Sequence, residues 1–233
     1  MELKFASYNI HKAVGLDGRR DPERILAVLR EIDADVVALQ EADRRFGRRE
    51  SVLPRDVLDH SPYRAVPLAL RPDSIGWHGN ALLVKKGIDI AGASVVPLPT
   101  LEPRGAIRAD LDAGGRRLRV VGMHLDLSGL RRRQQLRAIL AHVDGCDGAA
   151  PCVLMGDMNE WATRGGSLRV FTHGWNVLGC GRSFPARRPA APLDRIVISD
   201  CWGTVAHGVH HSALAAVASD HLPIWAKLEM PKI

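Results

Sequence analysis

The 233-residue sequence predicts one α/β domain, residues 1–233, in which two mixed β-sheets stack face to face and helices cover their outer sides. The first observation behind this prediction is the order of elements, strand–helix–strand followed by hairpins, which occurs once in each half of the chain. The second is the large number of short apolar runs, which two packed sheets would bury. The third is continuity, because no linker or low-complexity segment interrupts a chain that is long enough for one large core.

The first half of the chain begins with a strand, a helix and a second strand. Asp21 and Pro22 are typical of a helix N-terminus, and apolar side chains recur on one face of the helix that follows. The Arg-rich stretch 44–50 has no apolar period and predicts a loop. The elements predicted here, in order, are strand 3–10, helix 22–32, strand 36–40, a short helix from Pro54, and a strand pair at 63–70 and 80–86.

The second half contains a hairpin, a longer helix and several strands. Ala113-Gly114-Gly115 is a turn sequence between two strand-like runs, and Cys152 to Met155 is an apolar run typical of a strand buried on both faces. The predicted elements, in order, are strand 92–98, a rigid loop bracketed by prolines at 97–103, hairpin strands 107–111 and 118–124, helix 129–143, strand 152–157, a short helix near 165–172, strand 193–199, a strand within 203–218, and strand 222–229.

Composition narrows the class of protein. Hydrophobic residues make up 46% and charged residues 25%, as in an ordinary globular domain, and no apolar run is long enough to span a membrane. The N-terminal residues lack a signal-peptide pattern, which indicates the cytoplasm. The four cysteines lack C-x-x-C spacing, so neither a zinc site nor a disulfide framework is expected. The net charge of +6 fits an anionic substrate, although a general preference for Arg explains it equally well.

Polar residues recur where the predicted strands end. Taken singly, each has a structural explanation: Asn9 as a turn former, His124 as a core histidine with satisfied hydrogen bonds, or Asp220 as a cap. Together they supply the acids, amides and histidines that metal-assisted attack on a phosphate ester requires. The full set is Asn9, Glu41, His124, Asp157, Asn159, Asp194, Asp220 and His221.

The short motifs around these residues resemble the endonuclease/exonuclease/phosphatase family, which includes deoxyribonuclease I, exonuclease III, neutral sphingomyelinases and inositol polyphosphate phosphatases. The motifs span essentially the whole chain in the family's order: N-I-H at 9–11, L-Q-E at 39–41, G-N-A-L-L at 79–83, M-H-L at 123–125, G-D-M-N at 156–159, L-D-R-I at 193–196 and S-D-H-L-P at 219–223. The sequences of these motifs are most similar to those of bacterial metal-dependent hydrolases of this family. The resemblance implies a four-layer αββα sandwich and an enzyme that hydrolyses phosphoric esters with the help of Mg²⁺.

The resemblance also implies a metal site. Glu41 would bind the ion with Asn9 beside it, and a carboxylate with an amide suits Mg²⁺, which prefers oxygen ligands; Mn²⁺ is expected to substitute for it. Asp157, Asn159 and Asp220 are further candidates for a second metal position, and the sequence supports one metal or two.

The remaining roles concern the water and the phosphate. Asp157 would orient and deprotonate the attacking water, while Asn159 and the guanidinium of Arg104 would contact phosphate oxygens. His221, which we expect to pair with Asp220, would bind the phosphate or protonate it.

Two further residues complete the implied site. His124 matches a second phosphate-contacting histidine of the deoxyribonuclease I type, and Asp194 matches an acid that holds this network together. Trp161, two residues after Asn159, is expected to line the substrate cleft.

Departures from the family pattern bear on the substrate. Exonuclease III-like nucleases have a different segment where His11 and Lys12 stand, and their catalytic tyrosine position is occupied here by His124. The chain is also short for long DNA-gripping loops. We therefore expect a phosphodiester, or a phosphomonoester, as substrate. A nuclease acting on DNA or RNA is the alternative, and a non-catalytic binding module on the same fold is the second alternative.

Overall fold

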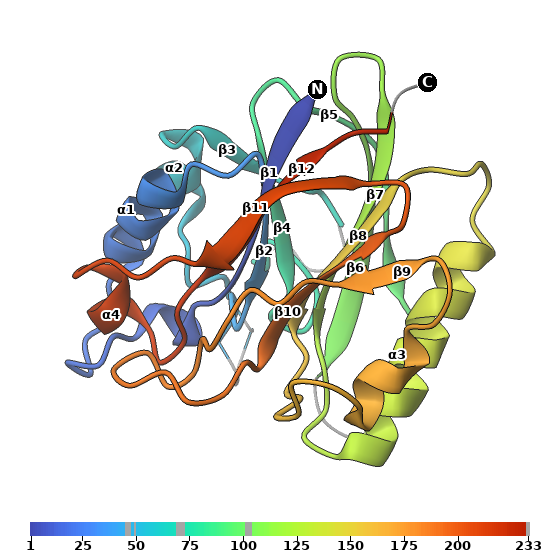
Figure 1. Ribbon diagram of the computed structural model, residues 1–233. Coiled ribbons are helices and arrows are strands. Elements are labelled where there is room, and N and C mark those ends of the chain that lie inside the picture. Colours follow the sequence, from blue (N-terminus) through green and yellow to red (C-terminus); the bar gives the residue numbers. More distant parts are fainter. Residues whose placement is uncertain (45–47, 49, 69–72, 101–103, 232–233) are drawn as a thin grey trace.

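The computed structural model describes residues 1–44, 48, 50–68, 73–100 and 104–231, and it shows two mixed sheets lying face to face (Figure 1). Within these residues each sheet has six strands. The first sheet, in spatial order, contains β11 (Gly203–Val209), β12 (Ile224–Glu229), β1 (Glu2–Asn9), β2 (Val36–Gln40), β4 (Ala81–Lys85) and β3 (Tyr63–Ala65). The second contains β5 (Asp89–Val96), β6 (Gly105–Asp112), β7 (Arg117–His124), β8 (Cys152–Asp157), β10 (Asp194–Ser199) and β9 (Trp175–Val177).

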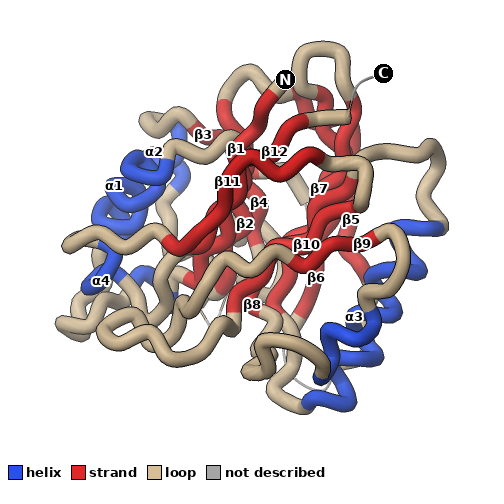
Figure 2. The backbone as a smooth tube through the Cα atoms, viewed as in Figure 1, coloured by secondary structure: helices blue, strands red, loops and turns tan. Residues whose placement is uncertain are grey.

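Helices cover the outer side of each sheet, which gives the predicted four-layer αββα sandwich (Figure 2). Helix α1 (Pro22–Ile32), with the short α2 (Arg55–Asp59) and α4 (Ala215–Ala218), packs on the first sheet. Helix α3 (Gly129–Asp144) packs on the second. Two 3₁₀ turns, η1 (His11–Ala13) and η2 (Gly166–Val170), lie in the connections. The predicted fold class is therefore confirmed.

The core divides into three apolar layers, and strand β8 shows why. Its side chains alternate, so that Val153 and Met155 enter the layer between the sheets, whereas Cys152 and Leu154 enter the layer beneath α3. A strand covered on both faces must be apolar at consecutive positions, as this run is. Burial on both faces holds β8 at the centre of the second sheet.

Strand directions bring the polar strand ends to one edge of the sandwich, here called the site edge. Strands β1 and β2 are parallel and place Asn9 opposite Gln40, so Glu41 follows directly beside them. Strands β7 and β8 are also parallel and place His124 opposite Asp157, and antiparallel β10 places Asp194 on the other side of Asp157. The site edge lies at the bottom of Figure 1.

The predicted elements are present, with some differences in length and type. Strand β3 ends at Ala65, earlier than expected, and parts of the predicted loops at 44–50 and 97–103 lie outside the described residues, as do 69 and 70. The short helix expected near 165–172 is the 3₁₀ turn η2. Strand β9 was missed because its three residues are half-exposed or exposed and carry no periodic pattern. Among the described helices, none is long and apolar enough to cross a membrane.

Candidate active site

Asp157 is the centre of the polar cluster at the site edge. Asn9 Nδ2 donates to its Oδ2 at 3.0 Å, which links the two sheets, and the backbone N–H of Asn159 donates to its Oδ1 at 2.9 Å. Gly156 makes the final approach of β8 possible, because a Cβ there would lie 1.9 Å from the carbonyl oxygen of Met123. A buried carboxylate is thus fixed on two sides while one side faces the histidines.

His221 is held against Asp157 by Asp194. Its Nδ1–H donates to Asp194 Oδ2 at 2.8 Å, and Ser183 Oγ donates to the same oxygen at 2.5 Å. The Nε2 of His221 then lies 3.8 Å from Asp157 Oδ2. Burial lowers the pKa of His221, but the charge of Asp194 and the hydrogen bond to it, together with Asp157 and Asp220, raise it to about 10. The imidazole is therefore a cation at neutral pH.

The expected pairing of His221 with Asp220 is wrong, because the imidazole takes Asp194 as its partner. Asp220 is half-buried beside His221 in the sequence, accepts a hydrogen bond from Ser219 Oγ at 3.3 Å, and lies 4.0 Å from the Nδ1 of His11. Residues 219–221 form a bend, in which the Asp220 carboxylate lies towards His11 and not against the ring of His221. Asp220 acts on His221 only through its charge.

His124 has the opposite electrostatic environment. Its Nε2 lies 3.4 Å from Asp157 Oδ2, and Arg104 Nη1 contacts the ring, 3.0 Å from Nδ1. Burial lowers the pKa of His124 to about 3; Asp157 opposes this, while Arg104 and the charged His221 add to it. One carboxylate is therefore flanked by a neutral and a charged imidazole. Groups whose pKa values are driven apart in this way are candidates for acid and base roles.

Glu41 and Asn9 carry oxygen atoms that could bind a metal ion. The Glu41 backbone takes a positive φ of 55°, and its partly exposed carboxylate forms an ion pair with the ammonium of Lys12. Asn9 Oδ1 accepts the N–H of His11 at 3.1 Å and keeps a second lone pair. A carboxylate that already pairs with a cation, and an amide oxygen with a lone pair to spare, are both ligand types that a divalent metal ion accepts.

A second group that can hold a cation consists of Asp157, Asp194 and His221, whose candidate ligand atoms all lie within 4.8 Å of one another. With His221 protonated, this group already contains one positive charge balanced against two carboxylates. Asn159, predicted as a ligand or phosphate contact, has its side-chain N–H₂ directed to the carbonyl oxygen of Leu125 at 2.9 Å and retains its other N–H.

Several residues that support the site were not predicted from the sequence. Ser183 and Phe184 precede a segment that returns to β10; Ser183 holds Asp194, and the Phe184 ring lies 4.8 Å from the His221 ring. Glu160 is buried and accepts hydrogen bonds from the N–H of Ser167 at 2.8 Å and from Arg132 at 3.3 Å. Burial raises the pKa of Glu160, but the hydrogen bonds from Ser167 and Ala162, together with the charge of Arg132, lower it to about 2. The motif Ser183-Phe184-Pro185 was the sequence signal from which Ser183 and Phe184 could have been found. No motif or periodicity indicated the hydrogen bonds of Glu160.

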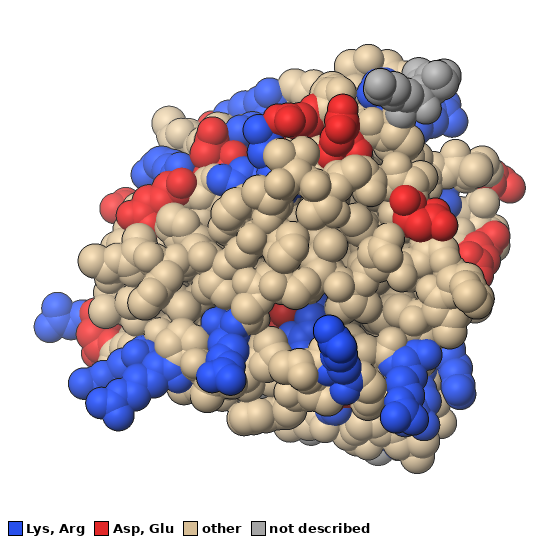
Figure 3. Space-filling view, in the orientation of Figure 1, with Lys and Arg blue, Asp and Glu red and all other residues tan. Residues whose placement is uncertain are grey.

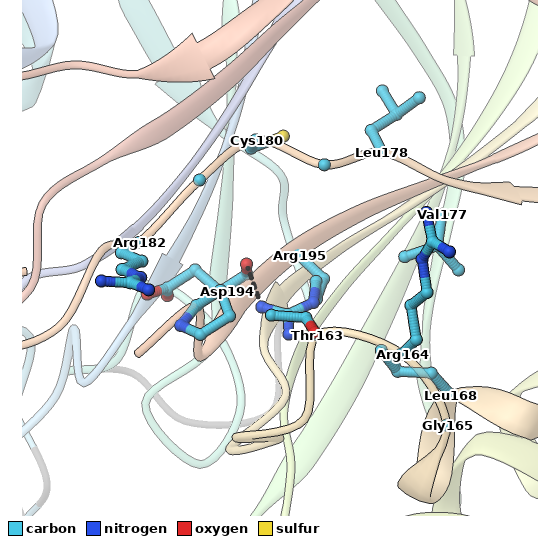
Figure 4. Close-up of a pocket in the computed structure, with 13 residues that line it drawn as sticks. Thr163, Arg164, Gly165, Leu168, Val177, Leu178, Cys180, Arg182, Asp194 and Arg195 are labelled. Carbon is cyan, nitrogen blue, oxygen red and sulfur yellow. Dashed lines mark hydrogen bonds between the residues drawn. The ribbon is translucent and has the colours of Figure 1, made fainter. Parts of the chain in front are cut away.

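A cavity of about 610 Å³ lies next to Asp194 (Figure 4). The exposed residues Arg164 and Arg182 line it, and Leu168 and Leu178 form part of its apolar wall. The buried guanidinium of Arg195 donates to the carbonyl oxygen of Asp194 at 3.1 Å and fixes this side of the wall.

A four-layer sandwich whose central strands end in acids, amides and histidines defines a class of phosphoester hydrolases. Residues 6–221 match the model of the Endonuclease/Exonuclease/phosphatase family, and the chain belongs to this family. No curated protein matches the sequence at a significant level.

Several solved structures share this fold at low sequence identity. A humanised TDP2 from D. rerio is 17% identical, with a TM-score of 0.79 and 98% of this chain and 99% of that chain covered. A family member from Bacteroides vulgatus is 17% identical, with a TM-score of 0.79 and 99% of both chains covered. A mannosyl-6-phosphatase from Bacteroides thetaiotaomicron is 18% identical, with a TM-score of 0.75 and 98% and 100% covered. At these identities the similarity concerns the fold.

Proposed function

We propose that this protein is a divalent-metal-dependent phosphoesterase that hydrolyses a phosphodiester by attack of an activated water. The observation that carries this proposal is the placement of one buried carboxylate, Asp157, between a charged His221 and a neutral His124. A base, a cation and a second proton-transfer group within a few ångströms are what attack on a phosphate ester needs.

Each residue then has a role consistent with its contacts. Asp157 orients the water and accepts its proton, because two donors fix the carboxylate without neutralising it. His221 presents its Nε2–H to a phosphate oxygen, while Asp194 maintains its charge. His124 and Arg104 approach the phosphate from the other side, with Asn159 beside Asp157.

Glu41 and Asn9 would hold Mg²⁺, which when bound neutralises phosphoryl charge and stabilises the leaving oxygen. Mn²⁺ is expected to replace it. Among phosphate esters, we propose a diester rather than a monoester as the substrate.

The direct test is hydrolysis of bis-p-nitrophenyl phosphate and of p-nitrophenyl phosphate with Mg²⁺ or Mn²⁺. We expect turnover of the diester that chelator abolishes and added metal restores, at a rate above that of the monoester. Plasmid nicking at matched protein concentration separates a nuclease from an enzyme for small diesters. Absence of metal-dependent turnover on every diester, monoester and nucleic acid tried would reject the enzyme in favour of a binding module.

Replacing Glu41 with Gln is expected to weaken metal binding rather than to remove the chemistry. The amide keeps the size of the side chain but loses the charge that attracts a divalent ion, so the metal concentration for half-maximal rate should rise at least about tenfold. Binding of Mn²⁺, followed by electron paramagnetic resonance without substrate, should weaken in parallel. Glu23→Gln, on the exposed face of α1, is the matched control. An unchanged metal curve for Glu41→Gln would remove Glu41 from the metal site.

A further inference from the structure

Charged side chains are distributed unevenly between the two edges of the sandwich. The segments that leave the site edge carry exposed arginines, namely Arg19, Arg20, Arg164, Arg169, Arg182, Arg187 and Arg188. The turns at the opposite edge carry many of the exposed carboxylates, among them Asp33, Asp89, Asp144, Asp147, Asp200 and Glu229. Figure 3 shows blue side chains along the lower rim, whereas red and blue side chains are mixed in the upper part of the view. The site edge is therefore attractive to an anionic surface.

Large apolar side chains project from the same edge. Leu127 and Leu130, at the start of α3, are 65% and 66% exposed, and Trp161, after β8, is 64% exposed. Leu16, in the connection after β1, is 46% exposed. Single exposed apolar residues are common, but these are among the largest exposures of apolar side chains in the described residues, and they share one edge with the arginines.

Buried contacts hold two of these side chains on neighbouring loops. The guanidinium of Arg132 donates to the carbonyl oxygen of Leu127 at 2.6 Å and contacts Glu160 Oε2 at 3.3 Å. Because Trp161 directly follows Glu160, this ion pair fixes the Leu127 and Trp161 loops against each other. Leu127 and Trp161 are therefore exposed on a rigid frame.

The apolar surface continues from this frame to the active-site imidazole. The ring centroids of Trp161 and Phe184 lie 6.4 Å apart, and those of Phe184 and His221 lie 4.8 Å apart. A molecule whose apolar part contacts Trp161 can thus bring a polar group to His221.

We propose that the site edge binds the surface of an anionic lipid bilayer, with Leu127, Leu130 and Trp161 entering the interface and the arginines contacting lipid phosphates. Aliphatic and Trp side chains beside basic residues are the combination that lies at a membrane surface. Projecting leucines contribute little to binding a nucleic acid, which uses charge and aromatic stacking. Resting on the proposed function, the substrate of the site would be the phosphate ester of a lipid headgroup.

Vesicle flotation in the presence of chelator tests the surface separately from turnover. We expect the wild type to bind vesicles of phosphatidylcholine with phosphatidylglycerol, and to bind vesicles of phosphatidylcholine alone at least about tenfold more weakly. The Leu127→Asp/Leu130→Asp double variant should lose at least about tenfold in affinity for the anionic vesicles. The matched control is Val205→Asp, on β11 towards the opposite edge, where Val205 is 49% exposed; its binding should be unchanged.

Trp161 supplies a second readout that does not depend on the leucines. Its emission should shift to shorter wavelength on addition of anionic vesicles and be quenched by brominated lipid, and Trp161→Phe should remove both effects.

Three results would overturn the lipid surface: no binding to anionic vesicles at low ionic strength, equal binding by the double leucine variant, or binding only to a single-stranded oligonucleotide. Vesicle binding without hydrolysis of any phosphate ester would leave the surface intact and reject the proposed function. Hydrolysis of soluble diesters without vesicle binding would support the proposed function and reject the lipid-binding surface.

Discussion

Replacing Asp157 with Ala is expected to lower turnover of a phosphodiester by at least about a hundredfold, which corresponds to about 2.7 kcal/mol of transition-state stabilisation. The substitution removes the carboxylate that lies between the two active-site histidines. Asn9 and Asn159, which now donate to it, would instead contact water. The reaction should therefore lose its base without a rearrangement of the sheets, and the measurement is kcat at saturating metal.

A second carboxylate provides the matched control for Asp157. Asp35 also accepts a backbone N–H, that of Lys4 at 2.7 Å, but it lies at the opposite edge. Asp35→Ala should lower the unfolding temperature while leaving kcat unchanged. If saturating metal restores kcat in Asp157→Ala, Asp157 is a metal ligand instead of a base. A near-normal rate at all metal concentrations would exclude it from the mechanism.

The sequence predicted the layers of the fold well because periodicity reports burial directly. Strand β8 has the predicted bounds 152–157, and α1 buries its predicted apolar face against a sheet. In α3, Leu136, Ile139 and Val143 are buried as expected, whereas Leu130 of the expected apolar face is 66% exposed. The turn after β1 shows a conformation that periodicity does not predict. His11, Lys12 and Ala13 all take positive φ, between 45° and 58°, which no side chain there favours and which tertiary contacts impose.

The candidate site was predicted as a set of residues, but its pairings were not. Motifs identify which side chains the family uses, and adjacency suggested Asp220 for His221. The partner chosen, Asp194, is 27 residues away and reaches His221 because β10 pairs with β8 in one register. The ion pair between Arg132 and Glu160 likewise spans 28 residues. Such contacts form when separate helices and strands pack together. A short sequence motif carries no information about that packing.

His221→Ala should lower kcat by at least about a hundredfold, because it removes a charged imidazole that the buried cluster directs at the phosphate. This loss is expected at any pH below about 10, where the wild-type imidazole is charged. A nearly normal rate would show that the metal and Arg104 suffice to bind the phosphate.

The charge of His221 should depend on Asp194 far more than on Asp220. Asp194 hydrogen-bonds the imidazole and raises its pKa, so the wild-type protein keeps His221 protonated until the pH approaches about 10. In Asp194→Asn the folded-state pKa falls, so kcat/KM should decline at a lower pH, and the imidazole proton resonances in an NMR titration should move with it. Asp220→Asn, which removes a charge but no hydrogen bond to the ring, should shift the decline less. If instead Asp220→Asn produced the larger shift, the pair that controls the imidazole would be the one that adjacency suggested, and the Asp194–His221 contact would serve only to position the ring.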